Sequence, residues 1–112
     1  MIKVMWLLKR AEHLTLKEFR TWWVEEHARD IVADQTPYLK RYIVDARIDD
    51  DTPFAGKPGT ECLWDGIAEQ WFDTIDDYNA IYSRTDRPTR EDTLAHTSAF
   101  ERLLVEEHEI PV

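Results

Sequence analysis

One histidine on an aromatic helix is the side chain best suited to chemistry in this sequence. The stretch from Trp22 to Asp30 reads WWVEEHARD, and apolar residues recur around it at helical spacing. A helix turns by about 100° per residue, so the apolar side chains share an arc of about 140° with His27 near its middle. We therefore expect His27 to point toward the interior of the protein. The apolar residues of this arc are Leu16, Phe19, Trp23, Val24 and Ile31.

Two interpretations of His27 are open. In one, the ring fills core volume and one nitrogen bonds to a carbonyl or a tyrosine. In the other, the ring lies at the back of an aromatic pocket, where desolvation lowers its pKa and leaves a neutral imidazole that can accept or donate a proton. The neighbouring Trp22 falls among the polar residues of the helix and is expected to cover another element.

Three polar side chains on predicted strands could join His27 at a site. The hydroxyl of Tyr42 could donate a hydrogen bond to a substrate oxygen, or the ring could simply pack. Glu69 and Gln70 point to opposite faces of their strand. With Gln70 inward, its amide could orient a substrate carbonyl, and Glu69 would lie at a subunit interface. With the reverse register, Glu69 would be the acid-base partner of His27; we favour Gln70 inward.

Further charged residues carry weaker signals. Arg84, Arg87 and Arg90 are expected to form a solvated face, although one of them could meet a substrate carboxylate at the mouth of a pocket. His96 follows Asp92 by four residues and is expected to cap a surface helix, with entry into the pocket as the alternative. No two histidines show the spacing of a ligand pair and no cofactor motif is present, so the sequence predicts neither metal nor cofactor.

The composition disfavours several classes of protein. The 112 residues, 43% of them hydrophobic and only three of them glycine, indicate one globular domain over residues 1–112. A formal net charge of −9 disfavours nucleic acid and anionic membranes as partners. No apolar run approaches the roughly 20 residues of a membrane span. Cys62 is the only cysteine, and we expect a cytoplasmic protein without an internal disulfide.

The predicted elements follow the order strand, helix, strand, strand, helix, strand. Thr15 stands three residues before Glu18 in a capping-box pattern, Pro37 ends the helix that follows, and Pro88 suits the first turn of a short extra helix. This βαββαβ order predicts an α+β, ferredoxin-like fold with a four-stranded antiparallel sheet and helices on one face. Apolar residues on both sheet faces predict a homodimer. The strands are expected near 2–9, 38–48, 67–72 and 100–110, and the helices near 16–33, 75–82 and 88–96.

The sequence also resembles the EthD-like family of the dimeric α+β barrel superfamily. The resemblance covers nearly the whole chain and rests on F-x-x-x-W-x-x-x-H at 19–27, P-x-L-x-R-Y at 37–42, AEQWFD at 68–73 and VEEH at 105–108. It implies two sheets that close into a barrel across a homodimer, with a pocket in each subunit between helices and sheet. It assigns the family's helix histidine to His27 and its second-strand tyrosine to Tyr42. Gln70 stands where some isomerase relatives have a cysteine, which argues against a cysteine-dependent mechanism.

The residues and the resemblance together predict a cofactor-independent enzyme that acts on a small aromatic, lactone or polyketide-like carbonyl compound by proton transfer. Isomerases, cyclases and decarboxylating lyases fit such a site, in aromatic degradation or secondary metabolism. The alternatives are a non-catalytic dimer that binds a hydrophobic metabolite or assists an oxygenase, and haem binding through His27. The expected catalytic residues are His27, Tyr42 and Gln70, and the expected substrate-binding residues are Phe19, Trp23, Glu69 and Trp71.

Overall fold

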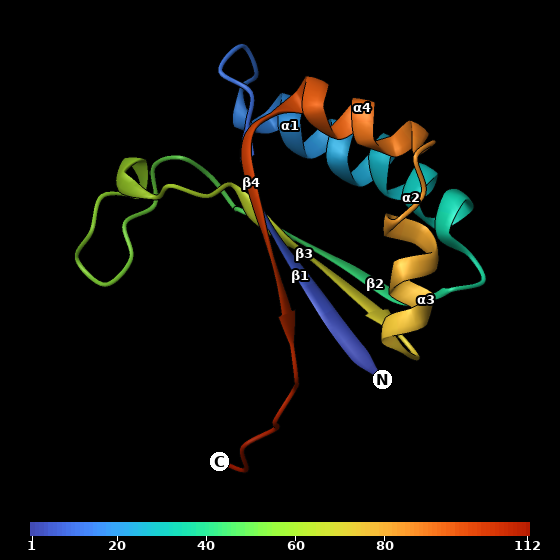
Figure 1. Cartoon of the computed structure of the whole chain (residues 1–112). Helices are drawn as coiled ribbons and strands as arrows, with labels where there is room; N and C mark the ends of the chain where they lie inside the picture. The colour runs from blue at the N-terminus through green and yellow to red at the C-terminus, as the bar shows by residue number, and fades with distance from the viewer.

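The computed structural model describes residues 1–112, apart from the side chain of Glu61. Its four strands form one antiparallel sheet in the spatial order β2-β3-β1-β4, and Figure 1 shows all the α-helices on one side of this sheet. The α+β class and the ferredoxin-like βαββαβ order predicted from the sequence are therefore confirmed. The strands are β1 (Ile2–Arg10), β2 (Leu39–Ala46), β3 (Gly66–Phe72) and β4 (Thr97–Val105).

The helices begin and end at local sequence signals. Thr15 and Glu18 form the predicted capping box, in which each side chain accepts a hydrogen bond from the backbone N–H of the other residue. The long helical segment ends at Gln35, because Thr36 precedes a proline and takes an extended conformation. No helix of the described chain is long and apolar enough to cross a membrane. The helices are α1 (Leu16–Thr21), η1 (Trp22–His27), α2 (Ala28–Gln35), η2 (Gly59–Glu61), α3 (Ile75–Tyr82) and α4 (Pro88–His96).

The last strand differs from its predicted range of 100–110. β4 begins at Thr97, directly after α4, and pairs with β1 from Arg10 to Lys3. This pairing ends at Val105 because its partner Lys3 is close to the start of β1. Residues 106–112 continue beyond the paired region, and Figure 1 shows them leading away from the body of the protein.

A π-helical turn interrupts the long helix near its centre. The N–H of Ala28 bonds to the carbonyl of Trp23, five residues earlier, and this wider turn changes which side chains face the sheet. Val24, predicted inside the apolar arc, is 52% exposed. That prediction was wrong because it assumed a regular helix of about 3.6 residues per turn. Trp22, expected to cover a neighbouring element, is buried with its indole bonded to Asp92 of α4.

The hydrophobic core lies between the helices and the sheet. Gly66, at the start of β3, allows close packing there, because a side chain at this position would collide with the Trp23 ring and the backbone carbonyl of Asp45. The indole of Trp23 can therefore lie directly against the sheet. The buried core residues are Leu8, Phe19, Trp22, Trp23 and Ala68 in one cluster and Val4, Phe72 and Ile81 in a second.

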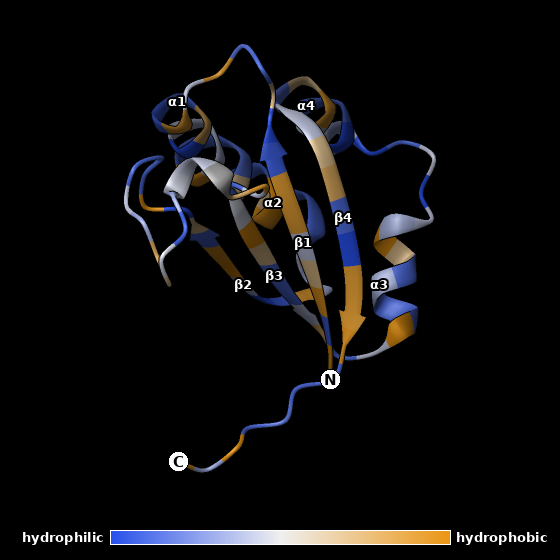
Figure 2. Cartoon of the chain, turned by 90° about the vertical axis from the view of Figure 1, so that its left-hand side faces the viewer, coloured by the Kyte–Doolittle hydropathy of each residue, from blue (hydrophilic) through white to orange (hydrophobic). Residues whose placement is uncertain are grey.

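No α-helix covers the other face of the sheet. Figure 2 looks onto this face. The strand register places Met5 of β1 between Glu69 of β3 and Leu103 of β4. Since Val4, the neighbour of Met5, is buried in the core, side-chain alternation puts Met5 and its two partners on the uncovered face.

Candidate active site

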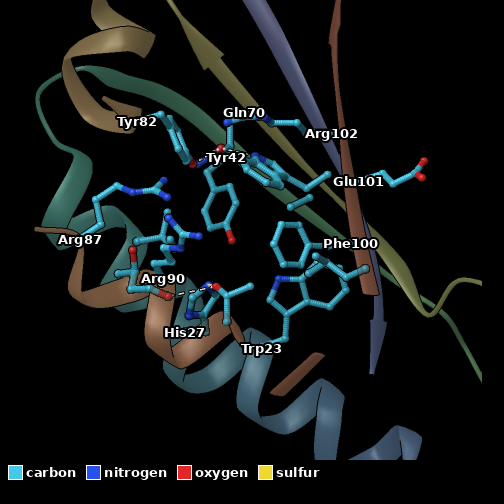
Figure 3. Close-up of a pocket in the computed structure, with 16 residues that line it drawn as sticks. Trp23, His27, Tyr42, Gln70, Tyr82, Arg87, Arg90, Phe100, Glu101 and Arg102 are labelled. Atoms are coloured by element: carbon cyan, nitrogen blue, oxygen red, sulfur yellow. Dashed lines mark hydrogen bonds between the residues drawn. The ribbon is translucent and has the colours of Figure 1, made fainter. Parts of the chain in front are cut away.

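A cavity of about 380 Å³ lies between the helices and the sheet. Figure 3 shows the residues around it, which come from all four strands, from η1, α2 and α3, and from α4 with the residue before it. The volume corresponds to roughly a dozen water molecules at about 30 Å³ each. It lies near the lower end of the range for small-molecule sites, about 300–1,000 Å³. The predicted site residues that line this cavity are Trp23, His27, Tyr42 and Gln70.

His27 is 4% exposed, and both of its ring nitrogens contact side chains of α4. Its Nδ1 atom lies 2.8 Å from Oδ2 of Asp92, and its Nε2 atom lies 3.2 Å from the hydroxyl of Thr93. Thr93 lines the cavity, whereas Asp92 does not. Since a carboxylate only accepts hydrogen bonds, Nδ1 carries the proton. The Nε2 lone pair of the neutral ring is therefore the one available on the cavity side.

Asp92 joins His27 to two further aromatic rings. The indole N–H of Trp22 donates to the Asp92 carboxylate, with Nε1 3.1 Å from each oxygen. The Trp22 ring stacks with the imidazoles of both His27 and His96, with centroid distances of 4.6 and 4.2 Å. His96 donates from Nδ1 to the backbone carbonyl of Asp92 at 2.7 Å and does not line the cavity. This stack fixes the orientation of both Asp92 and the His27 ring.

The surroundings of His27 favour its neutral form. Burial lowers the pKa of the imidazole, and the hydrogen bond with Asp92 only partly opposes this shift. The hydroxyl of Thr93 lies 3.0 Å from the carbonyl of Thr89 and donates to it. The same hydroxyl oxygen can accept a hydrogen bond from Nε2 when that nitrogen carries a proton, so the protonated His27 has an acceptor at each nitrogen. A histidine in this setting can take up and release a proton near neutral pH.

Tyr42 and Trp23 supply two hydrogen-bond donors to the same cavity. Burial raises the pKa of the Tyr42 phenol, so the hydroxyl keeps its proton at neutral pH, although the nearby indole N–H of Trp23 opposes the shift. In the described part of the chain the Tyr42 hydroxyl forms no hydrogen bond of ordinary geometry, and the buried Nε1 of Trp23 has no acceptor. A ligand oxygen placed in the cavity can accept from these donors.

Gln70 points inward, in the register that we favoured, and its amide is held by other side chains. The Oε1 atom accepts from Trp6 Nε1 and from the Tyr82 hydroxyl, each at 2.8 Å. The Nε2 atom donates to Gln35 at 2.8 Å. Gln70 therefore forms a fixed part of the cavity wall, with one amide N–H left to contact a ligand.

Three predicted substrate-binding residues do not line the cavity. Phe19 is fully buried in the aromatic core. Glu69 and Trp71 lie on the other face of the sheet, because side chains alternate along β3 and Gln70 points inward. The alternative in which Glu69 partners His27 is therefore wrong, and Asp92 takes that position.

Several residues of the site come from α4 and were not identified from the sequence. The sequence indicates Asp92 only as the helical neighbour of His96, and no sequence pattern marks Thr93. Of the arginines expected on a solvated face, Arg87 and Arg90 line the cavity. Their positions follow from the packing of α4 against η1, which no local sequence pattern reports.

Three solved structures share this fold at low sequence identity. An EthD-like protein from Ralstonia eutropha JMP134 is 17% identical, with a TM-score of 0.69 over 94% of this chain and 89% of that chain. A hydroxynitrile lyase from Passiflora edulis is 12% identical, with a TM-score of 0.67 over 98% and 96% of the two chains. A dimeric protein of unknown function and ferredoxin-like fold from Bacteroides fragilis NCTC 9343 is 15% identical, with a TM-score of 0.61 over 95% of each chain.

The family of the chain follows from its sequence. No curated protein matches the chain significantly. The family model for the EthD domain matches residues 11–92, most of the sequence. This range contains His27, Tyr42, Gln70 and Asp92, and it ends inside α4. The chain therefore belongs to the EthD domain family.

Proposed function

We propose that this protein is a cofactor-independent enzyme that transfers protons on a small carbonyl compound, in a reaction of the isomerase, cyclase or lyase type. One observation carries the proposal: His27 is buried, its Nδ1 is held by Asp92, and its Nε2 lies on the cavity side together with the Tyr42 hydroxyl. A structural neighbour named as a hydroxynitrile lyase supports small-molecule chemistry of the lyase type on this fold.

The proposed reaction begins at the carbon next to the substrate carbonyl. Nε2 of His27 takes a proton from this carbon, and the electrons of the broken C–H bond form a carbon–carbon double bond while the carbonyl electrons move to oxygen. The resulting enolate oxygen accepts a hydrogen bond from Tyr42. Where a further carbon–carbon double bond is conjugated with the enolate, return of the proton to the far carbon of that bond shifts the double bond and completes an isomerisation. Attack of the enolate carbon on a second carbonyl, followed by proton transfer to the new alkoxide, completes a cyclisation.

Asp92 acts as a positioning residue in this scheme. It holds the Nδ1–H tautomer of His27, and it lies beside the imidazolium that forms when Nε2 takes the proton. The Thr93 hydroxyl oxygen accepts from the protonated Nε2, while the hydroxyl donates its own hydrogen bond to the carbonyl of Thr89. The protonated ring is thus stabilised without entry of water.

Tyr42 suits the oxygen-binding role better than Gln70, the other residue predicted for it. The Tyr42 hydroxyl is free to donate, and burial raises its pKa, which keeps the proton in place. The Gln70 amide already has three hydrogen bonds to neighbouring side chains. We assign Gln70 the lesser role of a fixed wall that can add one donor.

Exchange of carbon-bound hydrogen for deuterium tests the proposal without knowledge of the natural substrate. Acetophenone, α-angelica lactone and 3-benzoylpropionate are incubated with the protein in D2O, and the loss of the signal next to the carbonyl is followed by NMR. We expect catalysed exchange with the wild type and a loss of about 10²–10⁴-fold in His27→Gln. His13→Gln, a change at an exposed loop histidine, is the matched control and keeps the wild-type rate. Equal rates in both variants would contradict the proposal.

The alternative function is a non-catalytic protein that binds a hydrophobic metabolite. The aromatic walls of the cavity, which include Trp6, Tyr82 and Phe100, support binding of this kind. Under this alternative a ligand raises the melting temperature, but no compound exchanges faster than in buffer. The same deuterium experiment thus separates the two functions.

We further propose that the functional unit is a homodimer formed through the uncovered face of the sheet. The neighbour from Bacteroides fragilis is described as dimeric. Leu103, on this face, is 53% exposed, and Met5 lies beside it. Burial of apolar side chains against a second sheet would stabilise such a dimer. Sedimentation of the wild type and of Leu103→Lys tests this, with a shift of the variant toward monomer as the expected result.

A further inference from the structure

The charge of the cavity differs from that of the whole chain. The chain has 23 acidic and 14 basic residues, yet three arginines and a single acidic residue, Glu101, line the cavity. Arg102 is already engaged, since it donates to the Tyr78 hydroxyl and stacks on Trp6. The other two arginines, Arg87 and Arg90, form no ion pair with any carboxylate of the described residues, whereas the nearby surface residue Arg84 does.

Arg87 and Arg90 are placed to act together. Arg87 precedes α4 and Arg90 lies in its first turn, and Figure 3 shows both side chains on the same side of the cavity, toward Tyr42. The guanidinium of Arg87 lies over the ring of Tyr82 with its carbon 5.1 Å from the ring centroid. This contact restricts the position of the guanidinium and uses none of its N–H donors. The first turn of α4, which has no side-chain cap, adds partial positive charge at the same place.

A second, independent observation also indicates a ligand. Nε1 of Trp23 is fully buried and forms no hydrogen bond of ordinary geometry in the described part of the chain; the Tyr42 hydroxyl lies near it, and both residues line the cavity. Buried polar groups in native proteins nearly always have a hydrogen-bond partner. An unpaired indole N–H at a cavity wall is explained if a ligand oxygen is its partner in the functional complex.

We infer that the cavity binds a small carbonyl compound that carries a carboxylate, with the carboxylate on Arg87 and Arg90 and another ligand oxygen on Trp23 Nε1. This inference rests on the proposed function in one respect, namely that the second ligand oxygen is the oxygen of the carbonyl that reacts. A carboxylate fits because its two oxygens match the paired N–H groups of a guanidinium. The apolar walls between the two ends accommodate the ring or chain that joins them.

Binding of paired acids and esters tests the inference. The acids are benzoylformate, 3-benzoylpropionate and 4-benzoylbutyrate, which differ in the separation of ketone and carboxylate, and each is compared with its methyl ester. Calorimetry measures affinity, and a ¹⁵N-resolved spectrum of the indole groups reports on Trp23 Nε1–H. We expect at least one acid to bind about tenfold or more tightly than its ester. The Trp23 signal, assigned with Trp23→Phe or by backbone-linked experiments, should move downfield.

Arginine variants identify the carboxylate-binding groups. The double variant Arg87→Gln with Arg90→Gln should bind acid and ester with equal affinity. Arg29→Gln, the same change at an exposed arginine of α2, is the control and should keep the wild-type preference. The inference is overturned if no acid binds, if every ester binds as tightly as its acid, or if the double variant keeps the preference.

The outcomes separate this inference from the proposed function. In one outcome, an acid binds tightly through the two arginines while no compound exchanges deuterium. That result would support the carboxylate site and contradict the proposed proton transfer. Exchange that depends on His27 but is equally fast for neutral and acidic compounds would support the chemistry and remove the inference.

Discussion

The Nδ1 atom of His27 lies 2.8 Å from Oδ2 of Asp92, a residue 65 positions further along the chain. This contact joins the π-helical turn of the first helical segment to α4. It decides which nitrogen of the imidazole carries the proton, and so which one is available on the cavity side. The properties of the site that can be tested most directly follow from it.

Asp92→Asn should impair proton transfer while the fold is retained. The asparagine oxygen can still accept from Trp22, and its amide then points an N–H at Nδ1 of His27, which places the imidazole proton on Nε2. We expect a fall in deuterium exchange within the range of about 10²–10⁴-fold seen for general bases. Asp86→Asn, at an exposed loop position, serves as the control. Unchanged exchange in Asp92→Asn would show that the tautomer does not matter.

The pH dependence of stability should carry a contribution from His27. Burial lowers the pKa of the folded imidazole below its ordinary value of 6.5, so the unfolded chain binds more protons between the two values. Stability from this group is complete above 6.5 and is lost as the pH falls toward the lowered pKa. Melting curves of the wild type and His27→Gln between about pH 5 and 8 measure it. The two profiles should diverge on the acidic side, and parallel profiles would contradict the expectation.

A second pH effect should arise on the uncovered face of the sheet. The hydrogen bond with Glu69 raises the pKa of Asp45 from 3.8 to about 6, while the pKa of Glu69 is lowered by the same bond and by Lys3. The folded state thus holds the Asp45 proton more tightly than the unfolded chain. This contribution to stability is complete below 3.8 and is lost as the pH rises through about 6.

Asp45→Asn should flatten the stability profile in this window, because its amide donates to Glu69 at every pH. Thermal melts in a pH series compare the variant with the wild type. Asp73→Asn, a change at an exposed position after β3, should leave the slope unaltered. A slope that persists in Asp45→Asn would assign the effect to another group.

Gly66→Ala should destabilise the fold and disturb the site at once. The added methyl group would collide with the Trp23 ring and the carbonyl of Asp45, and neither can move far in the packed core. Overpacking of this kind costs about 1–3 kcal/mol. Urea unfolding measures the loss, and the indole N–H signal of Trp23 reports the displacement of the ring. A variant as stable as the wild type would mean that the helix shifts freely on the sheet.

Local signals were sufficient to predict most of the fold. The capping box of Thr15 and Glu18, the proline at position 37 and the proline at the start of α4 act over a few residues, and the structure confirms the elements they bound. Period-two patterns located the strands and placed Glu69 and Gln70 on opposite faces of β3, but they left open which of the two points inward; the structure has Gln70 inward. The π-helical turn was not predicted, because the helical periodicity used for the prediction assumes a regular turn of about 3.6 residues.

The sequence by itself determined the α+β class, the βαββαβ order, and the burial of the histidine at position 27, because hydrophobic periodicity and capping depend on neighbours within one turn or one strand. Tertiary structure alone decided which groups surround that histidine. The partnership with Asp92, the arginines at the cavity and the unpaired indole of Trp23 arise where α4 packs against η1 and the sheet. Residues this far apart in the sequence come into contact only when whole helices and strands pack together, and no local sequence pattern encodes such contacts.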